Sequence, residues 1–249
     1  MEERPQPLKT RRAKRTDDKG RAFAGSQMHL QVWVNRRSSE LSRRILTAYN
    51  INLPPDSIRW LSPIEAASYR EYRDGAFLRA IGADKARTDL RQFWPSGGPV
   101  WDGLAETDSD ALGGRRIFLI EAKSYPQEVH GRGCQATAGS EALATIRRSL
   151  DRTAEWLNIK RTPAWEGKLY QSANRIAHLY FLREVLKVNA YMVNVCFVGD
   201  SRRPTDVATW EVAHAAFRAE LGIPPQAVPW LADIMVDAGN RAELLAAAI

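Results

Sequence analysis

Three charged residues lie in a stretch whose apolar pattern predicts a buried β-hairpin. Residues 99–125 contain two strand-like segments joined by a glycine-containing turn, and Asp102 lies in the first segment. The second segment is the apolar run IFLI, which leads directly into Glu121, Ala122 and Lys123. Side chains alternate between the two faces of a strand, so Glu121 and Lys123 project to the same side. An antiparallel partner strand can place Asp102 beside them.

Two carboxylates and an ammonium group at one point suit metal-assisted hydrolysis of a phosphate ester. A buried carboxylate without a compensating charge is costly, and a divalent cation removes that cost. We expect Asp102 and Glu121 to ligate Mg²⁺, with the carbonyl oxygen of Ala122 as a third ligand. Lys123 would orient or help deprotonate the attacking water and offset charge on the phosphate. The alternative is an ion pair of Lys123 with either acid at a sheet edge, without metal.

The same residues resemble the motif of a known enzyme superfamily. In "PVWDG…IFLIEAK" the pattern is similar to that of the PD-(D/E)xK nucleases, with Pro99 and Asp102 separated by two residues and Glu121-Ala122-Lys123 intact. The resemblance implies a restriction-endonuclease-like αβββαβ core over roughly residues 62–200. It also implies cleavage of DNA, or sometimes RNA, with Mg²⁺ or Mn²⁺. The longer pattern, from YREYRDGAFLR to YQSANRIAHLYFLRE, is similar to a poorly characterised bacterial group within this superfamily.

The superfamily resemblance implies a further metal-binding acid on the helix before the hairpin. Residues 62–82 have a helical pattern, and Ser62 with Glu65 forms a capping box. Glu71 lies on the apolar stripe of that helix, where an unpartnered charge would be costly, so it is our fourth catalytic candidate. Glu65 and Asp74 are weaker candidates. The alternative for Glu71 is a rotated helix and an ion pair with a neighbouring arginine.

A polar stripe lies on the long helix that the pattern predicts over residues 168–186. Gln171, Asn174, Arg175 and His178 are spaced as i, i+3, i+4 and i+7. The resemblance places this helix beside the site, so we expect Gln171, Asn174 and Arg175 to bind substrate, with Gln171 holding a metal-bound water and Arg175 contacting the scissile phosphate. The alternative is a solvated helix face. For His178 we favour an ordinary hydrogen-bonded residue over a general base.

The remaining patterns predict an α/β protein with a mixed central sheet flanked by helices. Strands are predicted where apolar residues alternate or form short continuous runs, and helices where they recur every three or four residues. The predicted strands are 29–35, 57–61, 190–200 and a peripheral strand over 229–239. The predicted helices, apart from those above, are 38–50, 140–157 and 206–221.

Composition limits the classes of protein that the chain can belong to. Its 249 residues are 44% hydrophobic and include eight tryptophans, enough for a packed core. No run of eighteen apolar residues occurs and the amino end lacks a secretory apolar region, so we expect a cytoplasmic protein without a membrane partner. The two cysteines are far apart and lack metal-type spacing, which predicts a reducing compartment and no zinc site.

Positive charge is concentrated near the amino end. Residues 1–27 hold eight basic and four acidic residues, a balance of +4, which leaves +3 of the total +7 for residues 28–249. We therefore predict a disordered basic tail over 1–27 and a single domain over 28–249. Such a tail could contact nucleic-acid phosphates, and the alternative is that it is only solvated.

The function expected from these observations is that of a metal-dependent nuclease acting through a metal-activated water, with DNA as the expected partner. A second hypothesis is a catalytically inactive module of the same fold that binds nucleic acid or a protein. The small excess charge of +3 outside the tail favours this second hypothesis, because a nuclease must hold a polyanion. A homodimer is left open.

Overall fold

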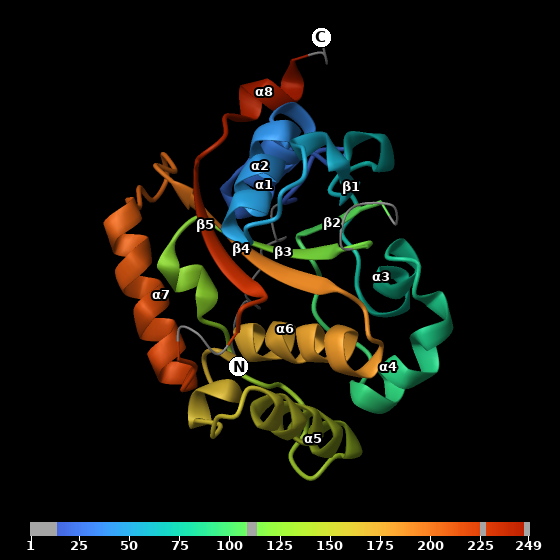
Figure 1. The fold of residues 1–249 in the computed structure, drawn as a ribbon. Coiled ribbons are helices and arrows are strands. Elements are labelled where there is room, and N and C mark those ends of the chain that lie inside the picture. Colours follow the sequence, from blue (N-terminus) through green and yellow to red (C-terminus); the bar gives the residue numbers. More distant parts are fainter. Residues whose placement is uncertain (1–13, 109–113, 225–227, 247–249) are drawn as a thin grey trace, which may run out of the picture.

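A mixed five-stranded sheet forms the centre of the computed structural model, which describes residues 14–108, 114–224 and 228–246 (Figure 1). The strands lie in the order β1-β2-β3-β4-β5. The first three pair antiparallel, whereas β3, β4 and β5 run parallel. Their bounds are Ile58–Ser62, Gly103–Thr107, Ile117–Lys123, Ala190–Val198 and Leu231–Asp237. The expected α/β fold with a mixed sheet is confirmed.

Helices cover both faces of this sheet (Figure 1). One face is covered by α1 (Gly25–Arg36) and α2 (Ser38–Ala48), and the short helix α8 (Arg241–Leu245) packs against α1. The other face is covered by α3 (Asp74–Ala80), α4 (Arg87–Phe93), α5 (Glu141–Trp156), α6 (Tyr170–Tyr180) and α7 (Val207–Leu221). A π-helical segment, Phe181–Val185, continues α6. Single 3₁₀ turns span Pro55–Ser57, Glu65–Ala67, Asp84–Ala86, Pro126–Val129 and Pro163–Trp165.

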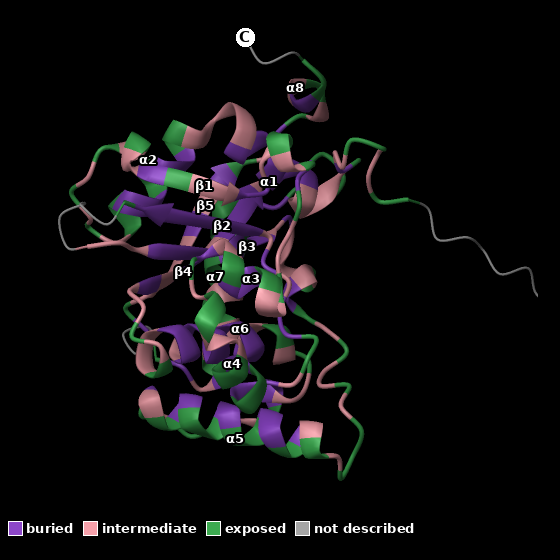
Figure 2. Cartoon of the chain, turned by 90° about the vertical axis from the view of Figure 1, so that its right-hand side faces the viewer, coloured by how far each residue is buried: buried purple, intermediate pink, exposed green. Residues whose placement is uncertain are grey.

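The apolar run of β3 is buried on both faces of the sheet. Ile117 and Leu119 pack into the core beneath α5 and α6, whereas Phe118, Ile120 and Ala122 pack against α1 and α2. Strands buried on both faces need a continuous apolar sequence rather than an alternating one. Figure 2 shows the resulting buried layer in purple at the centre of the molecule. Because of this alternation, the next two side chains on the α6 face are Glu121 and Lys123.

Most of the predicted elements are present. The helices predicted over 38–50, 140–157 and 206–221 are α2, α5 and α7, and the helix predicted over 168–186 is α6 with its π-helical end. The strands predicted over 57–61, 190–200 and 229–239 are β1, β4 and β5. The hydroxyl of Ser140 caps α5 by accepting a hydrogen bond from the amide of Leu143 at 3.1 Å. Strand β5 is an edge strand, as the prediction of a peripheral strand implied.

The strand predicted over 29–35 is wrong, because these residues belong to helix α1. Every residue from Met28 to Val34 is buried, so the alternation of polar and apolar types does not mark an exposed face. The polar members have internal partners: His29 Nε2 lies 3.0 Å from Asp200 Oδ2, and Gln31 Oε1 accepts from the amide of Ala22 at 2.8 Å. Such partners are supplied by distant segments and leave no mark in a local pattern.

The helix predicted over 62–82 is present only from Asp74 to Ala80. Ser62 ends β1, Glu65–Ala67 is a single 3₁₀ turn, and α3 begins only at Asp74. The chain reverses at Ser68 and Tyr69, which both have positive φ angles of 52° and 54°. Glu65 does not close a capping box; its carboxylate pairs with Arg36 at 2.9 Å.

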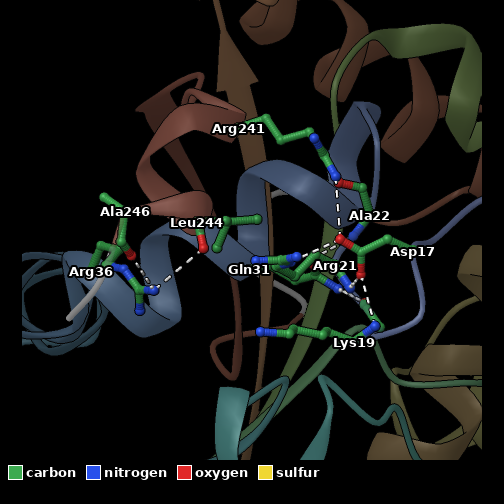
Figure 3. Close-up of polar contacts among 10 residues, drawn as sticks. Asp17, Lys19, Arg21, Ala22, Gln31, Arg36, Arg241, Leu244 and Ala246 are labelled. Atoms are coloured by element: carbon green, nitrogen blue, oxygen red, sulfur yellow. Dashed lines mark hydrogen bonds and ion pairs between the residues drawn. The ribbon is translucent and has the colours of Figure 1, made fainter.

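Residues 14–27 are not a disordered tail, because they form an ordered segment that we call the arm. Thr16 and Ala22 pair across a small antiparallel turn, and Ala22 is fully buried. Figure 3 shows how Asp17 accepts hydrogen bonds from Arg21 and from Arg241, the first residue of α8. The domain therefore begins before residue 28, and residues 1–13 of the predicted tail lie outside the described residues.

One glycine determines how closely the arm approaches the body of the protein. Gly20 has a φ of +83°, and a Cβ atom there would lie 2.3 Å from the carbonyl oxygen of Ser68. Replacing Gly20 by Ala should lower the free energy of unfolding by roughly 1–3 kcal/mol, measured by urea denaturation. Gly97→Ala is the control, since Gly97 has a similar φ of +89° with no atom within 4 Å. Equal losses for the two variants would contradict close packing of the arm.

Candidate active site

The hairpin brings Asp102 to the end of β3. Gly103 pairs with Ile120, so Asp102 lies just before β2 and not within the strand as expected. Its Oδ2 atom accepts a hydrogen bond from the amide of Ala122 at 2.8 Å. Close approach of the two strands requires the glycine, because a Cβ on Gly103 would lie 3.1 Å from the Cβ of Ile120.

Glu121 is the centre of a buried group of charges. Its carboxylate pairs with Lys123 on one oxygen and with Arg175 of α6 on the other. The side chains of Glu121, Lys123 and Arg175 are 6%, 15% and 11% exposed, so water screens these ion pairs only weakly. The predicted convergence of Glu121 and Lys123 is therefore present, and Arg175 joins them from the helix that was expected to lie beside the site.

The charges shift one another's pKa values. Burial, and then the nearby Glu121 carboxylate, raise the pKa of Asp102 to about 8. Burial alone would raise the pKa of Glu121, but Arg175 and Lys123 outweigh it and lower that pKa. Burial alone would lower the pKa of Lys123, but Glu121 and Asp102 outweigh it and raise that pKa. At neutral pH and without a cation, Glu121 is ionised, Lys123 is protonated and Asp102 largely retains its proton.

Glu71 reaches this group, although not from a helix. It lies in an extended segment beside Tyr72, which pairs with Trp101 next to Asp102. Gln27 of α1 donates a hydrogen bond to Glu71 Oε1 at 2.9 Å. Burial raises the pKa of Glu71, and the negative charge of Glu121 adds to this rise.

The two weaker acid candidates have other roles. Asp74 accepts hydrogen bonds from the amides of Gly97 and Gly98 at 3.1 and 2.9 Å, which holds the loop before the hairpin. Glu65 is engaged by Arg36. Neither acid is therefore placed with the carboxylates of the hairpin.

The polar stripe of α6 is mostly buried, so the alternative of a solvated helix face is wrong for three of its four members. Asn174, Arg175 and His178 are buried, whereas Gln171 is exposed. Burial lowers the pKa of His178 to about 4, and its Nδ1 lies 2.9 Å from the carbonyl oxygen of Asn174. His178 is thus a neutral hydrogen-bonded residue, as favoured. Gln171 lies at a cavity that Glu121 and Lys123 also line.

Part of the polar surface beside the site was missed at the level of sequence. Asn194 on β4 lies in register with Glu121, and Asp233 on β5 lies in register with Asn194. Asn194 donates to Asp233 Oδ1 at 2.7 Å, and Arg218 of α7 pairs with Asp233 Oδ2 at 2.6 Å. The available signal was Asn194 itself, a lone polar residue within the apolar run AYMVNVCFV.

The donor atoms at the site are of the type that binds a hard divalent cation, but their present arrangement does not form a metal site. Within the described ranges, no group of three or more His, Cys, Asp or Glu residues could hold a metal ion as arranged. Both oxygens of Glu121 are occupied by cationic side chains. Yet Asp102 retains a proton that a cation could replace, and Glu71 adds a third carboxylate nearby. The amide of Ala122 donates to Asp102, and the metal-binding role expected for its carbonyl oxygen stays a prediction.

Comparison of the chain with protein-family models, with curated proteins and with solved structures found no significant match. Among the described residues, no helix has the length and apolar character needed to cross a membrane.

The raised pKa of Asp102 predicts a pH-dependent cost to the metal-free protein. The pKa is about 8 in the folded chain against an ordinary value of 3.8. Between about pH 4 and pH 8 the unfolded chain therefore loses this proton while the folded chain keeps it, and the free energy of unfolding falls as pH rises. Asp102→Asn should remove this cost. At pH 8 in EDTA the variant should unfold with a free energy higher by at least about 1 kcal/mol, the equivalent of one pKa unit.

The measurement is urea denaturation of the two proteins at pH 5 and pH 8. The expected result is a difference in stability that grows with pH, since other titrating groups contribute similarly to both proteins. A variant that is less stable than the wild type at both pH values would contradict the assignment.

Proposed function

We propose that this protein is a divalent-metal-dependent nuclease that hydrolyses phosphodiester bonds, with DNA as the expected substrate. The observation that carries the proposal is the meeting of Asp102, Glu121 and Lys123 at the end of β3, where a buried carboxyl group retains a proton at neutral pH. A purely structural ion pair of Glu121 with Lys123 does not require a second buried carboxyl group beside it.

The order of the elements supports a restriction-endonuclease-like core. Helices α1 and α2 precede the antiparallel strands β1, β2 and β3, and α5 with α6 then connects β3 to the parallel strand β4. Helices α3 and α4 lie between β1 and β2. Without them the order is similar to the αβββαβ order that the resemblance implies, with its first helix taken from before the expected span of residues 62–200. The Glu-x-Lys sequence lies at the carboxyl end of β3, and the adjoining helix α6 supplies Arg175.

Each residue then has a distinct role. Asp102 and Glu121, assisted by Glu71, would hold Mg²⁺ or Mn²⁺. When bound, the ion supplies a water of lowered pKa and a positive charge next to the phosphate. Lys123 has a raised pKa, so it serves as a hydrogen-bond donor that orients the water and stabilises negative charge, rather than as a proton acceptor.

The helix α6 contributes substrate contacts in this proposal. Arg175 would move from Glu121 to the scissile phosphate when the cation binds, since the guanidinium and the cation would compete for the same oxygen of Glu121. Gln171 is exposed at the adjoining cavity and is free to contact a metal-bound water or the substrate. Asn174 is only 7% exposed, so it too needs a rearrangement to reach a polymer.

Lys123→Ala should abolish cleavage while preserving the fold. We expect a loss of roughly 10²–10³-fold in the rate of Mg²⁺-dependent cleavage, the usual cost of removing one donor that stabilises a transition state. The assay uses linear, circular and single-stranded DNA with Mg²⁺ or Mn²⁺. Lys187→Ala is the control, because Lys187 is exposed and pairs with Glu184 at the surface. Undiminished Mg²⁺-dependent cleavage by Lys123→Ala would refute the proposal.

The occupied oxygens of Glu121 favour a second candidate, a catalytically inactive module of the same fold. Isothermal titration with Mn²⁺ separates the two candidates. For the nuclease we expect one bound ion in the wild-type protein and weaker binding in Asp102→Asn, since a carboxylate ligand is lost. Absence of binding to the wild-type protein would favour the inactive module.

A further inference from the structure

An open basic groove adjoins the candidate active site. It has a volume of about 670 Å³, and its lining includes Arg15, Phe23, Gln27, Tyr125, Arg202 and Arg203. We call it the arm groove, because the arm forms one of its walls. Gln27 also donates the hydrogen bond to Glu71, so the groove reaches the edge of the carboxylate group.

The topology explains why the groove and the site lie together. Tyr125 follows Lys123 by two residues at the carboxyl end of β3, and Arg202 and Arg203 follow the carboxyl end of β4. These two strands pair in parallel, so the loops after them meet at the same edge of the sheet. A ligand lying in the arm groove is thereby led toward Glu71.

Two arginines of the groove are available to a ligand, whereas Lys14 pairs with Asp18 at 3.2 Å and the acids of the groove accept hydrogen bonds. Within the part of the chain that the structure describes, the side chains of Arg15 and Arg202 make no hydrogen bond or ion pair. Asp200 is held by His29 at 3.0 Å and by the amide of Arg202 at 2.8 Å. Glu128 accepts a hydrogen bond from the amide of Ser124 at 2.6 Å. The groove therefore presents positive charge to a polyanion.

Aromatic rings complete the lining. Phe23 is 47% exposed, and the guanidinium of Arg241 lies 4.9 Å from the centroid of the Phe23 ring. Tyr125 lies beneath Arg203 at 4.5 Å. An exposed ring beside guanidinium groups suits an unpaired base, since bases within a duplex already stack on each other.

Hydrogen bonds fix the backbone of the arm that carries Arg15 and Phe23. The amide of Phe23 donates to the carbonyl oxygen of Arg15 at 3.1 Å. Gln31 of α1 donates to the carbonyl oxygen of Gly20 at 3.0 Å and accepts from the amide of Ala22 (Figure 3). This wall of the groove is thus built before a ligand arrives, which lowers the entropic cost of binding.

We propose that the arm groove binds an unpaired strand of nucleic acid, with phosphates on Arg15, Arg202 and Arg203 and a base on Phe23. The purpose assigned to it, delivery of a strand to Glu71 and Glu121, rests on the proposed nuclease function. Strand binding itself requires no metal and no cleavage.

The test measures fluorescence anisotropy of labelled dT and rU oligonucleotides of about 12 nucleotides, and of a duplex of equal length, in EDTA. The protein is the full chain carrying Lys123→Ala. Adding Arg202→Ala and Arg203→Ala should weaken single-strand binding by roughly tenfold and reduce the slope of log K against log salt by about 0.7 for each lost phosphate contact. Arg152→Ala is the control, since Arg152 is exposed on α5, on a different part of the molecule.

Phe23→Ala tests the stacking contact separately. It should weaken binding by roughly tenfold without changing the salt slope, and Phe23→Trp should restore affinity. Thermal unfolding of each variant shows whether the arm remains folded. An arm that unfolds in Phe23→Ala would also lose the salt-dependent contacts, which the unchanged slope excludes.

Tighter binding of duplex than of both single strands, or an equal loss of affinity in Arg152→Ala, would overturn the proposal. Failure of the nuclease function gives a different result, since the wild-type protein then cleaves nothing while strand binding in the groove persists. Conversely, unchanged single-strand binding by the Arg202 and Arg203 variants, together with Mg²⁺-dependent cleavage by the wild type, would refute the groove and leave the nuclease proposal intact.

Discussion

The site depends on the compensated burial of Glu121. An isolated carboxylate at the end of a strand buried on both faces would be strongly unfavourable. Lys123 supplies one positive charge from the same strand, and Arg175 supplies a second from α6. The pairing attaches α6 to the sheet and holds Lys123 against the end of β3. Asp102 is itself buried and lies beside this negative charge, and the two effects together raise the pKa of its carboxyl group far above the usual range.

The carboxyl edge of the parallel strands gathers the polar chemistry of the molecule. Asn194 and Asp233 extend the line of polar side chains from Glu121 across β4 and β5. The loops that follow β3 and β4 carry Tyr125, Arg202 and Arg203 into the arm groove. The small net charge outside residues 1–27 therefore says little about nucleic-acid binding, because the relevant cations are concentrated in one groove while the acids nearby are hydrogen-bonded internally.

Two errors at the level of sequence share a physical cause. The segment 29–35 has polar residues at alternate positions, yet His29 and Gln31 are buried against Asp200 and Ala22. Residues 62–82 contain the local signals of a helix start, yet Arg36 removes Glu65 from the capping box. In both segments a partner far along the chain outweighs local propensity, and a local pattern does not report such partners. Glu71 was selected from a part of the predicted helix that does not form, but it lies at the expected place because Tyr72 pairs beside Asp102.

By itself, the sequence determined the hairpin, the shared face of Glu121 and Lys123, and the helices α5, α6 and α7, since each follows from side-chain periodicity within one segment. Only the tertiary structure decided that Arg175 pairs with Glu121, that Glu71 approaches from an extended segment, and that the arm packs beside the site. These contacts join segments separated by tens of residues. They form because burying charged and polar groups requires a partner, and the fold as a whole determines which partners come within reach.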